Sequence, residues 1–88
     1  MLIKPSTRKW KKLMVNVNGK WIHFGDNRYE DFTIHNDENR RINYLKRHWN
    51  VYDKKGNRVI MDPESPSYWS ARVLWGFNPK KDIHLLQG

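Results

Sequence analysis

Positively charged side chains gather in the first twelve residues, where no acidic residue interrupts them. The run holds Trp10 together with five cations, Lys4, Arg8, Lys9, Lys11 and Lys12. Lysine and arginine neutralise phosphates, and the release of counterions from the polyanion makes such contacts favourable. An aromatic ring inside the run adds a surface on which a base can stack. The pattern predicts a basic arm, residues 1–12, that contacts a polyanion; a charged terminus that only aids solubility is the alternative.

A second basic cluster follows at helical spacing. Arg40, Tyr44 and Arg47 fall on one face of a helix predicted over residues 37–48, and Arg41 flanks them. Guanidinium groups on such a face can bind a phosphate backbone while the tyrosine stacks on a base. A solvated helix face is the alternative interpretation. The residues predicted to contact nucleic acid are Lys9, Trp10, Lys11, Lys12, Arg40, Arg41, Tyr44 and Arg47.

Other chemistries find little support in the residue types. The chain has no cysteine, and its four histidines are widely spaced, so no metal site is expected. Neighbouring carboxylates occur only as Glu30-Asp31, Asp37-Glu38 and Asp62 with Glu64, without a glycine-rich phosphate loop or a nucleophile motif. We therefore expect a non-enzymatic protein that has no catalytic residues, binds no metal or cofactor and takes no small-molecule substrate.

Length and composition limit the chain to one small domain. Its 88 residues carry 17 Lys and Arg against 9 Asp and Glu, a formal net charge of +8. Hydrophobic residues make up only 38% of the chain, but 14% is aromatic, so a few large side chains must build the core. No apolar segment is long enough for a signal peptide or a membrane span. We expect an intracellular protein that is not secreted and makes no contact with a membrane.

Local patterns predict an N-terminal β-hairpin. Asn18-Gly19 favours a type I′ turn between strands at residues 13–17 and 21–24. The register places one set of side chains on the buried face: Leu13, Val15, Ile22 and Phe24. The opposite face then carries Met14, Asn16, Trp21 and His23. Polarity alternates again over residues 29–34, which predicts a short third strand or an extended segment.

Two main helices are predicted after the hairpin. Asn36 is a suitable N-cap for the helix over residues 37–48, and basic residues in its last turn complement the helix dipole. Ser65 followed by proline begins a second helix, Pro66 to Trp75, which Gly76 ends. A short strand at residues 58–61 and a short final helix at residues 80–86 complete the pattern.

These elements predict an α+β fold. Residues 13–88 form a single domain in which the hairpin, extended to three antiparallel strands by residues 29–34, packs against the two main helices. The residues expected in its aromatic core are Phe24, Phe32, Trp49, Trp69, Val73 and Trp75.

Several motifs follow one another along the chain: residues 23–25, 29–35, 37–48 and 69–75 and then Lys81-Asp82-Ile83. Together they resemble a family of small uncharacterised proteins of large DNA viruses of algae and protists and of some phages. The resemblance covers the chain from about Lys4 to Ile83. It implies a viral origin and a place in the virion or the host-cell interior, cytoplasm or nucleus, and it implies no activity. The segment between Asn50 and Ser65 departs from the pattern as an insertion.

Charge and resemblance together predict a small viral accessory or virion protein that contacts nucleic acid, DNA or RNA, through its basic arm and basic helix face. A minor capsid or cement protein that bridges larger viral structural proteins is the alternative. Its interface would use Met14, Trp21, Lys54 and Lys55. A phage-encoded inhibitor of a host defence complex, with the basic face in a nucleic-acid-like or acidic groove, is a third interpretation.

Overall fold

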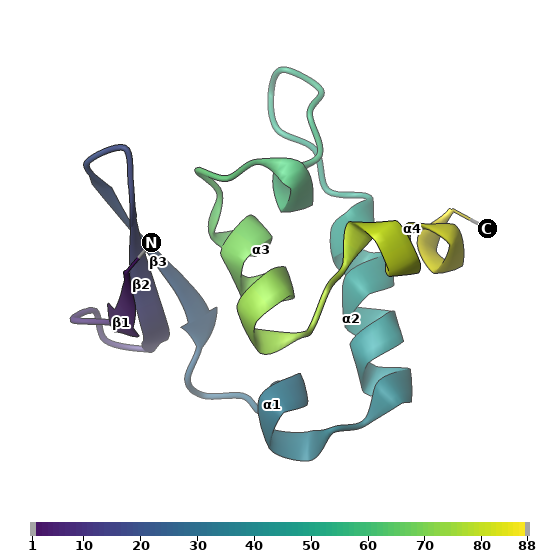
Figure 1. The fold of residues 1–88 in the computed structure, drawn as a ribbon, viewed down its shortest axis with the longest axis horizontal. Helices are drawn as coiled ribbons and strands as arrows, with labels where there is room; N and C mark the ends of the chain where they lie inside the picture. Colours follow the sequence, from purple (N-terminus) through teal and green to yellow (C-terminus); the bar gives the residue numbers. More distant parts are fainter. Residues whose placement is uncertain (1, 88) are drawn as a thin grey trace.

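A computed structural model of the chain describes residues 2–87 and has an α+β fold, as predicted (Figure 1). Three antiparallel strands in the order β1-β2-β3 form a sheet on one side, and the helices gather on the other. The elements are β1 (Ile3–Pro5), β2 (Lys11–Val17), β3 (Lys20–Asp26), α1 (Phe32–His35), α2 (Glu38–Trp49), the 3-10 helix η1 (Val59–Met61), α3 (Pro66–Trp69), the π-helix η2 (Ser70–Leu74) and α4 (Pro79–Leu86).

The predicted hairpin and its register are confirmed. Asn18 and Gly19 both have positive φ, at 53° and 82°, as the turn requires. The strands pair Val17 with Lys20, Val15 with Ile22 and Leu13 with Phe24. Val15, Ile22 and Phe24 are buried beneath the helices. The hairpin therefore supplies one wall of the core.

The third strand is not the predicted one. β1 pairs antiparallel with β2 and brings Ile3 opposite Val15, so part of the predicted arm over residues 1–12 belongs to the sheet. The strand predicted at residues 29–34 is wrong, because Asp31 accepts a hydrogen bond from the Thr33 N–H and begins helix α1 there. An N-capping side chain outweighs the alternating polarity of this short segment.

Helix α2 lies where it was predicted, with a different cap. The side chain of Asp37 accepts hydrogen bonds from the N–H groups of Asn39 and Arg40. Asn36, predicted as this cap, instead ends α1 in a left-handed conformation with φ 53°. A tight connection thus sets α1 against the start of α2.

The second predicted helix, over residues 66–75, changes its geometry along its length. Ser65 caps it and Pro66 begins it as expected, but the chain leaves α geometry after Trp69 and continues as the π-helix η2. A π-helix holds more residues per turn than an α-helix, so it shifts the facing of the later side chains. Ala71 and Leu74 of η2 point into the core.

The predicted strand at residues 58–61 is also wrong, and the predicted final helix is confirmed as α4. A single bridge joins Tyr52 to Arg58, after which the chain turns into η1 and buries Ile60 completely. The segment thus buries Ile60 in a tight turn and does not continue as a paired strand.

The core lies between the sheet and the helices. Phe24, Trp49 and Trp75 are buried as predicted, whereas Phe32, Trp69 and Val73 are only partly buried around them. The buried residues that complete the cluster are Val15, Val17, Ile22, Leu45, Ile60, Ala71, Leu74 and Phe77. Among residues 2–87 no helix is long and apolar enough to cross a membrane.

Replacing Gly25 by alanine is expected to lower the free energy of unfolding by about 2 kcal/mol, because overpacking adds to a strained backbone. Gly25 has φ +79°, and a Cβ there would lie 2.5 Å from Leu74 Cδ1 and 3.3 Å from Lys12 Cβ. Gly56→Ala is the matched control, because Gly56 has φ +86° with nothing within 4 Å of a Cβ. Urea unfolding of both variants measures the difference, and equal losses would contradict the close packing at Gly25.

Candidate nucleic-acid interface

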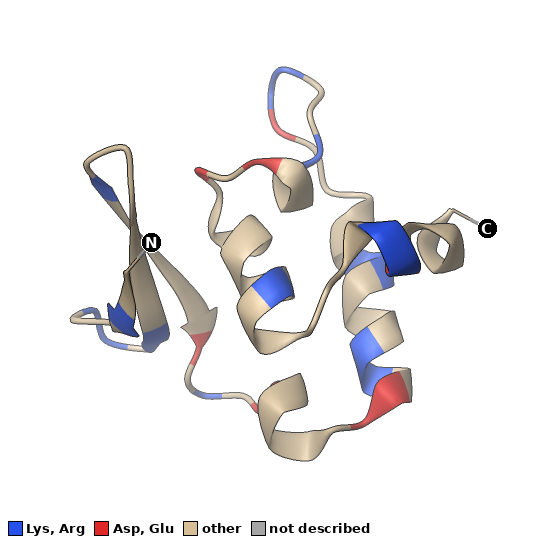
Figure 2. Cartoon of the chain, in the orientation of Figure 1, with Lys and Arg blue, Asp and Glu red and all other residues tan. Residues whose placement is uncertain are grey.

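A cleft of about 650 Å³ opens between the sheet and the exposed face of α2. Its walls come from β2, the segment after β3, α2 and the start of α3. The cleft is lined by four cations: Lys11, Lys12, Arg40 and Arg47. We call it the basic cleft. Figure 2 shows Lys and Arg on both the sheet and α2. The cleft brings together cations that lie about thirty residues apart in the sequence.

Three of these cations remain available to a ligand. Lys11, Arg40 and Arg47 are exposed, and the last two stand on the same face of α2, two turns apart. The Nη1 atom of Arg40 lies 3.5 Å from Glu30 Oε2, but both side chains are more than half exposed. An exposed pair of this kind holds its partners weakly, so a phosphate can compete for Arg40.

Lys12 lines the cleft with its charge already compensated. Its Nζ donates a hydrogen bond to Asp31 Oδ2, and Asp31 is only 3% exposed. Burial by itself would raise the pKa of Asp31, but hydrogen bonds from Lys12 and Thr33 outweigh it and lower that pKa below its usual value. Lys12 therefore forms an internal ion pair with Asp31, and its charge is not free to contact a phosphate as predicted.

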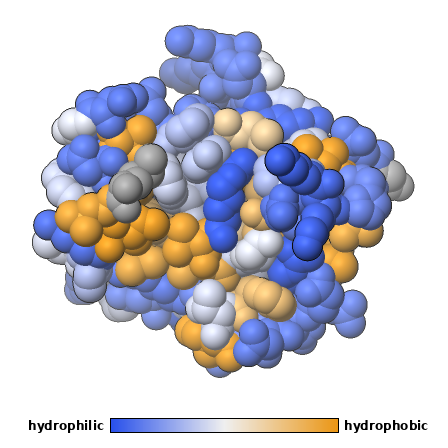
Figure 3. Space-filling view, in the orientation of Figure 1, coloured by the Kyte–Doolittle hydropathy of each residue, from blue (hydrophilic) through white to orange (hydrophobic). Residues whose placement is uncertain are grey.

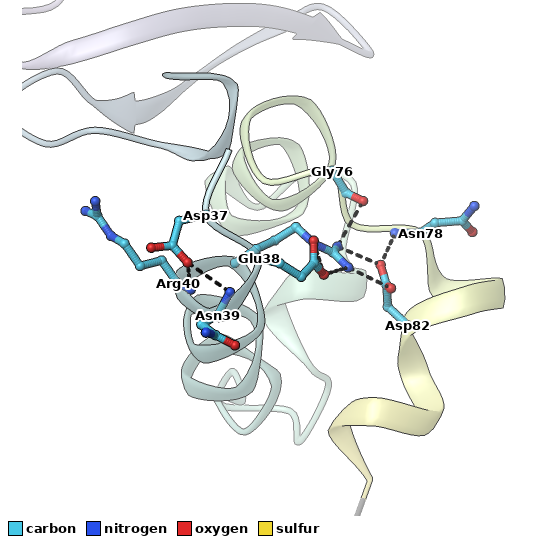
Figure 4. A network of polar contacts seen from close by, with 8 residues as sticks. Asp37, Glu38, Asn39, Arg40, Gly76, Asn78 and Asp82 are labelled. Atoms are coloured by element: carbon cyan, nitrogen blue, oxygen red, sulfur yellow. Dashed lines mark hydrogen bonds and ion pairs between the residues drawn. The ribbon is translucent and has the colours of Figure 1, made fainter. Parts of the chain in front are cut away.

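Arg41 is the clearest departure from the predicted site. Its guanidinium is buried and donates to both carboxylate oxygens of Asp82, at 3.1 and 3.2 Å, and to Gly76 O at 3.3 Å. The exposed Glu38 carboxylate adds a contact at 2.7 Å from Nη2. Figure 4 shows Glu38, Gly76 and Asp82 converging from three parts of the chain. Arg41 joins α2 to α4 and does not face the cleft, so it is not a phosphate contact.

Tyr44 forms part of the floor of the cleft and does not project from it. Its ring stacks on Trp75 at a centroid distance of 4.1 Å and an interplanar angle of 5°, and its hydroxyl lies 3.0 Å from Ser70 Oγ. The His48 ring packs against it at 4.2 Å. Burial raises the pKa of Tyr44 and lowers that of His48. Tyr44 already has a stacking partner, which corrects its predicted role as a free platform for a base.

Trp10 and Lys9 do not line the cleft, although Trp10 directly precedes Lys11, which does. Trp10 is 47% exposed, with Lys9 Nζ 5.0 Å and Arg28 Cζ 5.2 Å from its ring centroid. Arg28 and the exposed Tyr29 were not predicted as site residues, because residues 25–27 indicated only a turn. The sequence signal that could have found Arg28 is Asp26, two residues before it. The Asp26 carboxylate accepts two hydrogen bonds from the Arg28 guanidinium and holds it in place.

The alternative interface is not brought together as one surface. Met14 is only 6% exposed, because β1 makes β2 the central strand and places Lys4 and His23 on either side of Met14. Trp21 is 38% exposed, with Lys4 Nζ 4.7 Å from its ring. The exposed Lys54 and Lys55 belong to a separate turn. Apolar side chains gather over the sheet in Figure 3, and the turn projects from another part of the molecule (Figure 1).

Metal-ligating side chains are dispersed over the part of the chain that the structure describes. Within residues 2–87, no three His, Asp or Glu side chains lie close enough together to hold a metal ion. The acidic residues near the cleft each have a basic partner: Asp26 with Arg28, Glu30 with Arg40 and Asp31 with Lys12. The cations of the cleft without a carboxylate partner among the described residues are Lys11 and Arg47.

Comparison with known proteins relates the chain to one family. No curated protein and no solved structure matches the chain. The model of a family of unknown function, DUF5754, matches residues 1–48. The matched segment spans β1 to β3, α1 and most of α2, and it contains all four cations of the basic cleft. Since the match covers more than half of the chain, this protein belongs to the family of unknown function DUF5754.

Proposed function

We propose that this protein is a non-enzymatic nucleic-acid-binding protein, and that the basic cleft is its binding site. The observation that carries the proposal is the convergence of Lys11 from β2 with Arg40 and Arg47 from α2 on one hollow of the surface. Contacts from lysine and arginine to phosphates position a protein on a nucleic acid, so several exposed cations in one cleft suit a phosphate backbone. A viral accessory or virion setting, as the resemblance implies, is part of the proposal.

The electrostatic balance of the cleft supports this choice. Asp26 and Asp31 are neutralised by their own partners, Arg28 and Lys12. Among the described residues, Lys11 and Arg47 form no ion pair, and Arg40 has only its exposed contact with Glu30. The chain as a whole carries a net charge of +8. A nucleic acid therefore meets a positive field at long range and exposed cations at the site.

The test removes the three exposed cations together. For Lys11→Ala/Arg40→Ala/Arg47→Ala we expect the slope of log K against log salt to become shallower by about 2 to 3 units, since each phosphate contact contributes about 0.7–0.9. The matched control, Lys54→Ala/Lys55→Ala/Lys81→Ala, removes the same charge from exposed positions outside the cleft. Fluorescence anisotropy with labelled DNA and RNA over a salt series measures both.

Two outcomes would contradict the proposal. An equal change of slope in the control variant would mean that overall charge, and not the cleft, attracts nucleic acid. No binding by the unmodified protein at low salt would exclude nucleic acid as the partner. The alternative of a larger viral structural protein, contacted through Trp21, Lys54 and Lys55, would then be the one to pursue, by co-sedimentation with nuclease-treated particles.

A further inference from the structure

Two exposed aromatic rings and one guanidinium form a cluster that adjoins the basic cleft through Tyr29. Trp10 is 47% exposed and Tyr29 is 69% exposed. The Arg28 Cζ atom lies 5.2 Å from the Trp10 ring centroid and 5.9 Å from the Tyr29 ring centroid. These three residues are called the aromatic platform below. Neither ring belongs to the hydrophobic core.

The aromatic platform is held in position by hydrogen bonds. Asp26 accepts from Arg28 Nε at 3.0 Å through Oδ1 and from Nη2 at 2.8 Å through Oδ2, which fixes the plane of the guanidinium. The pKa of Asp26 is lowered to about 2, first by the side-chain hydrogen bond from Arg28, so the pair stays ionised. The N–H of Asn27 donates to Trp10 O at 2.9 Å and joins the two segments. A ligand would meet a largely preorganised surface.

The backbone of Trp10 is strained where it closes the turn between β1 and β2. Trp10 has φ 71°, in the left-handed region that a bulky side chain rarely adopts. Its ring nevertheless faces solvent between Lys9 and Arg28. Strain of this kind is retained mainly at functional sites. An exposed tryptophan in such a conformation, next to cations, has the features of a ligand contact.

The aromatic platform is continuous with the cleft. Tyr29 lines the cleft directly, and Lys11, which also lines it, follows Trp10 in the chain. A strand whose phosphates contact Lys11 would therefore place its bases close to the rings. Aromatic and guanidinium planes stack on the faces of unpaired bases, which a duplex hides inside its own stack.

We infer that the aromatic platform of Trp10, Arg28 and Tyr29 stacks on unpaired bases and makes this protein select single-stranded over double-stranded nucleic acid. The inference rests on the proposed function and names its substrate class. The face of a base is common to DNA and RNA, so both kinds of single strand are expected to bind.

The experiment compares oligothymidylate, oligouridylate and a duplex of the same length by fluorescence anisotropy. Trp10→Ala and Tyr29→Ala are each expected to weaken single-strand binding about tenfold, the loss of one stacked base, and to change duplex binding by less than about twofold. Trp10→Phe keeps a ring and should retain most of the affinity. Trp21→Ala is the matched control, because Trp21 is also exposed with a lysine over its ring but does not belong to the aromatic platform.

The outcomes separate this inference from the function on which it rests. Equal affinity of the unmodified protein for single strands and duplex would overturn single-strand selection while leaving the cleft as a nucleic-acid site. Parallel losses on single strands and duplex in Trp10→Ala, with circular dichroism showing a folded variant, would overturn the stacking role. No binding to any of the three probes would overturn both. If Trp10→Ala and Tyr29→Ala lost affinity for oligouridylate but not for oligothymidylate, the inference would be restricted to RNA and its extension to DNA would be overturned.

Discussion

Replacing Asp82 by alanine is expected to lower the free energy of unfolding by about 3–5 kcal/mol, the usual cost of breaking a buried ion pair, because it leaves Arg41 with only the exposed Glu38 as an acidic partner. Arg41 and Asp82 are 10% and 8% exposed at their side chains and are joined by two hydrogen bonds. Asp82 also accepts a hydrogen bond from the Asn78 N–H at 2.9 Å. The loss is large against the about 5–15 kcal/mol that stabilises a typical domain.

Urea unfolding followed by tryptophan fluorescence measures this effect. Glu38→Ala is the control, since Glu38 contacts the same guanidinium with a side chain that is 57% exposed, and we expect it to cost about 1 kcal/mol or less. The double variant Arg41→Met/Asp82→Leu removes both charges and should recover much of the loss. If Asp82→Ala were no more harmful than Glu38→Ala, the ion pair would not hold α4 against α2 as described.

Elements that depend on neighbours in the sequence were predictable. The hairpin follows from Asn18-Gly19 and the alternation on both sides of that turn, and its register is the observed one. Helix α2 follows from Ile42, Leu45 and Trp49 at helical spacing and from basic residues in its last turn. These signals come from residues within a few positions of one another. Only the cap was misplaced, by the single residue that separates Asn36 from Asp37.

Elements that depend on distant contacts were not predictable in the same way. β1 has only three residues, and its strand identity comes from pairing with β2. The π-helix η2 arises in a segment whose apolar residues surround the helix axis, so their pattern does not specify the residue count per turn. Ile60 is buried by a 3-10 turn that no alternation of polarity indicates. In each case tertiary packing selects the local geometry.

The candidate site shows the same division. Five of the eight predicted nucleic-acid contacts line the basic cleft: Lys11, Lys12, Arg40, Tyr44 and Arg47. Whether each one is free to bind depends on partners elsewhere in the chain. Arg41 finds its carboxylate forty-one residues later, and Tyr44 finds Trp75. Residue type and spacing predict a basic surface, but they do not reveal which charges are already compensated.

Opposite changes in nucleic-acid affinity are expected when the Lys12–Asp31 ion pair is broken by replacing one partner or the other. Asp31→Asn and Lys12→Met should each cost about 3 kcal/mol of unfolding free energy, because each leaves a largely buried charge unpaired. The side chain of Lys12 is 17% exposed and that of Asp31 is 4% exposed. Because both are largely buried, the two stability losses should be similar. Asp31→Asn, however, frees a cation at the wall of the cleft, whereas Lys12→Met leaves a carboxylate there.

If the basic cleft binds nucleic acid, Asp31→Asn binds more tightly than the unmodified protein, and its salt slope steepens by up to about one unit for the added phosphate contact. Lys12→Met binds more weakly. Both variants are compared with the unmodified protein by anisotropy at a temperature where circular dichroism shows all three folded. Since the two changes disturb the same ion pair, a structural disturbance alone would move both affinities in one direction. That result would mean that nucleic acid does not occupy the cleft.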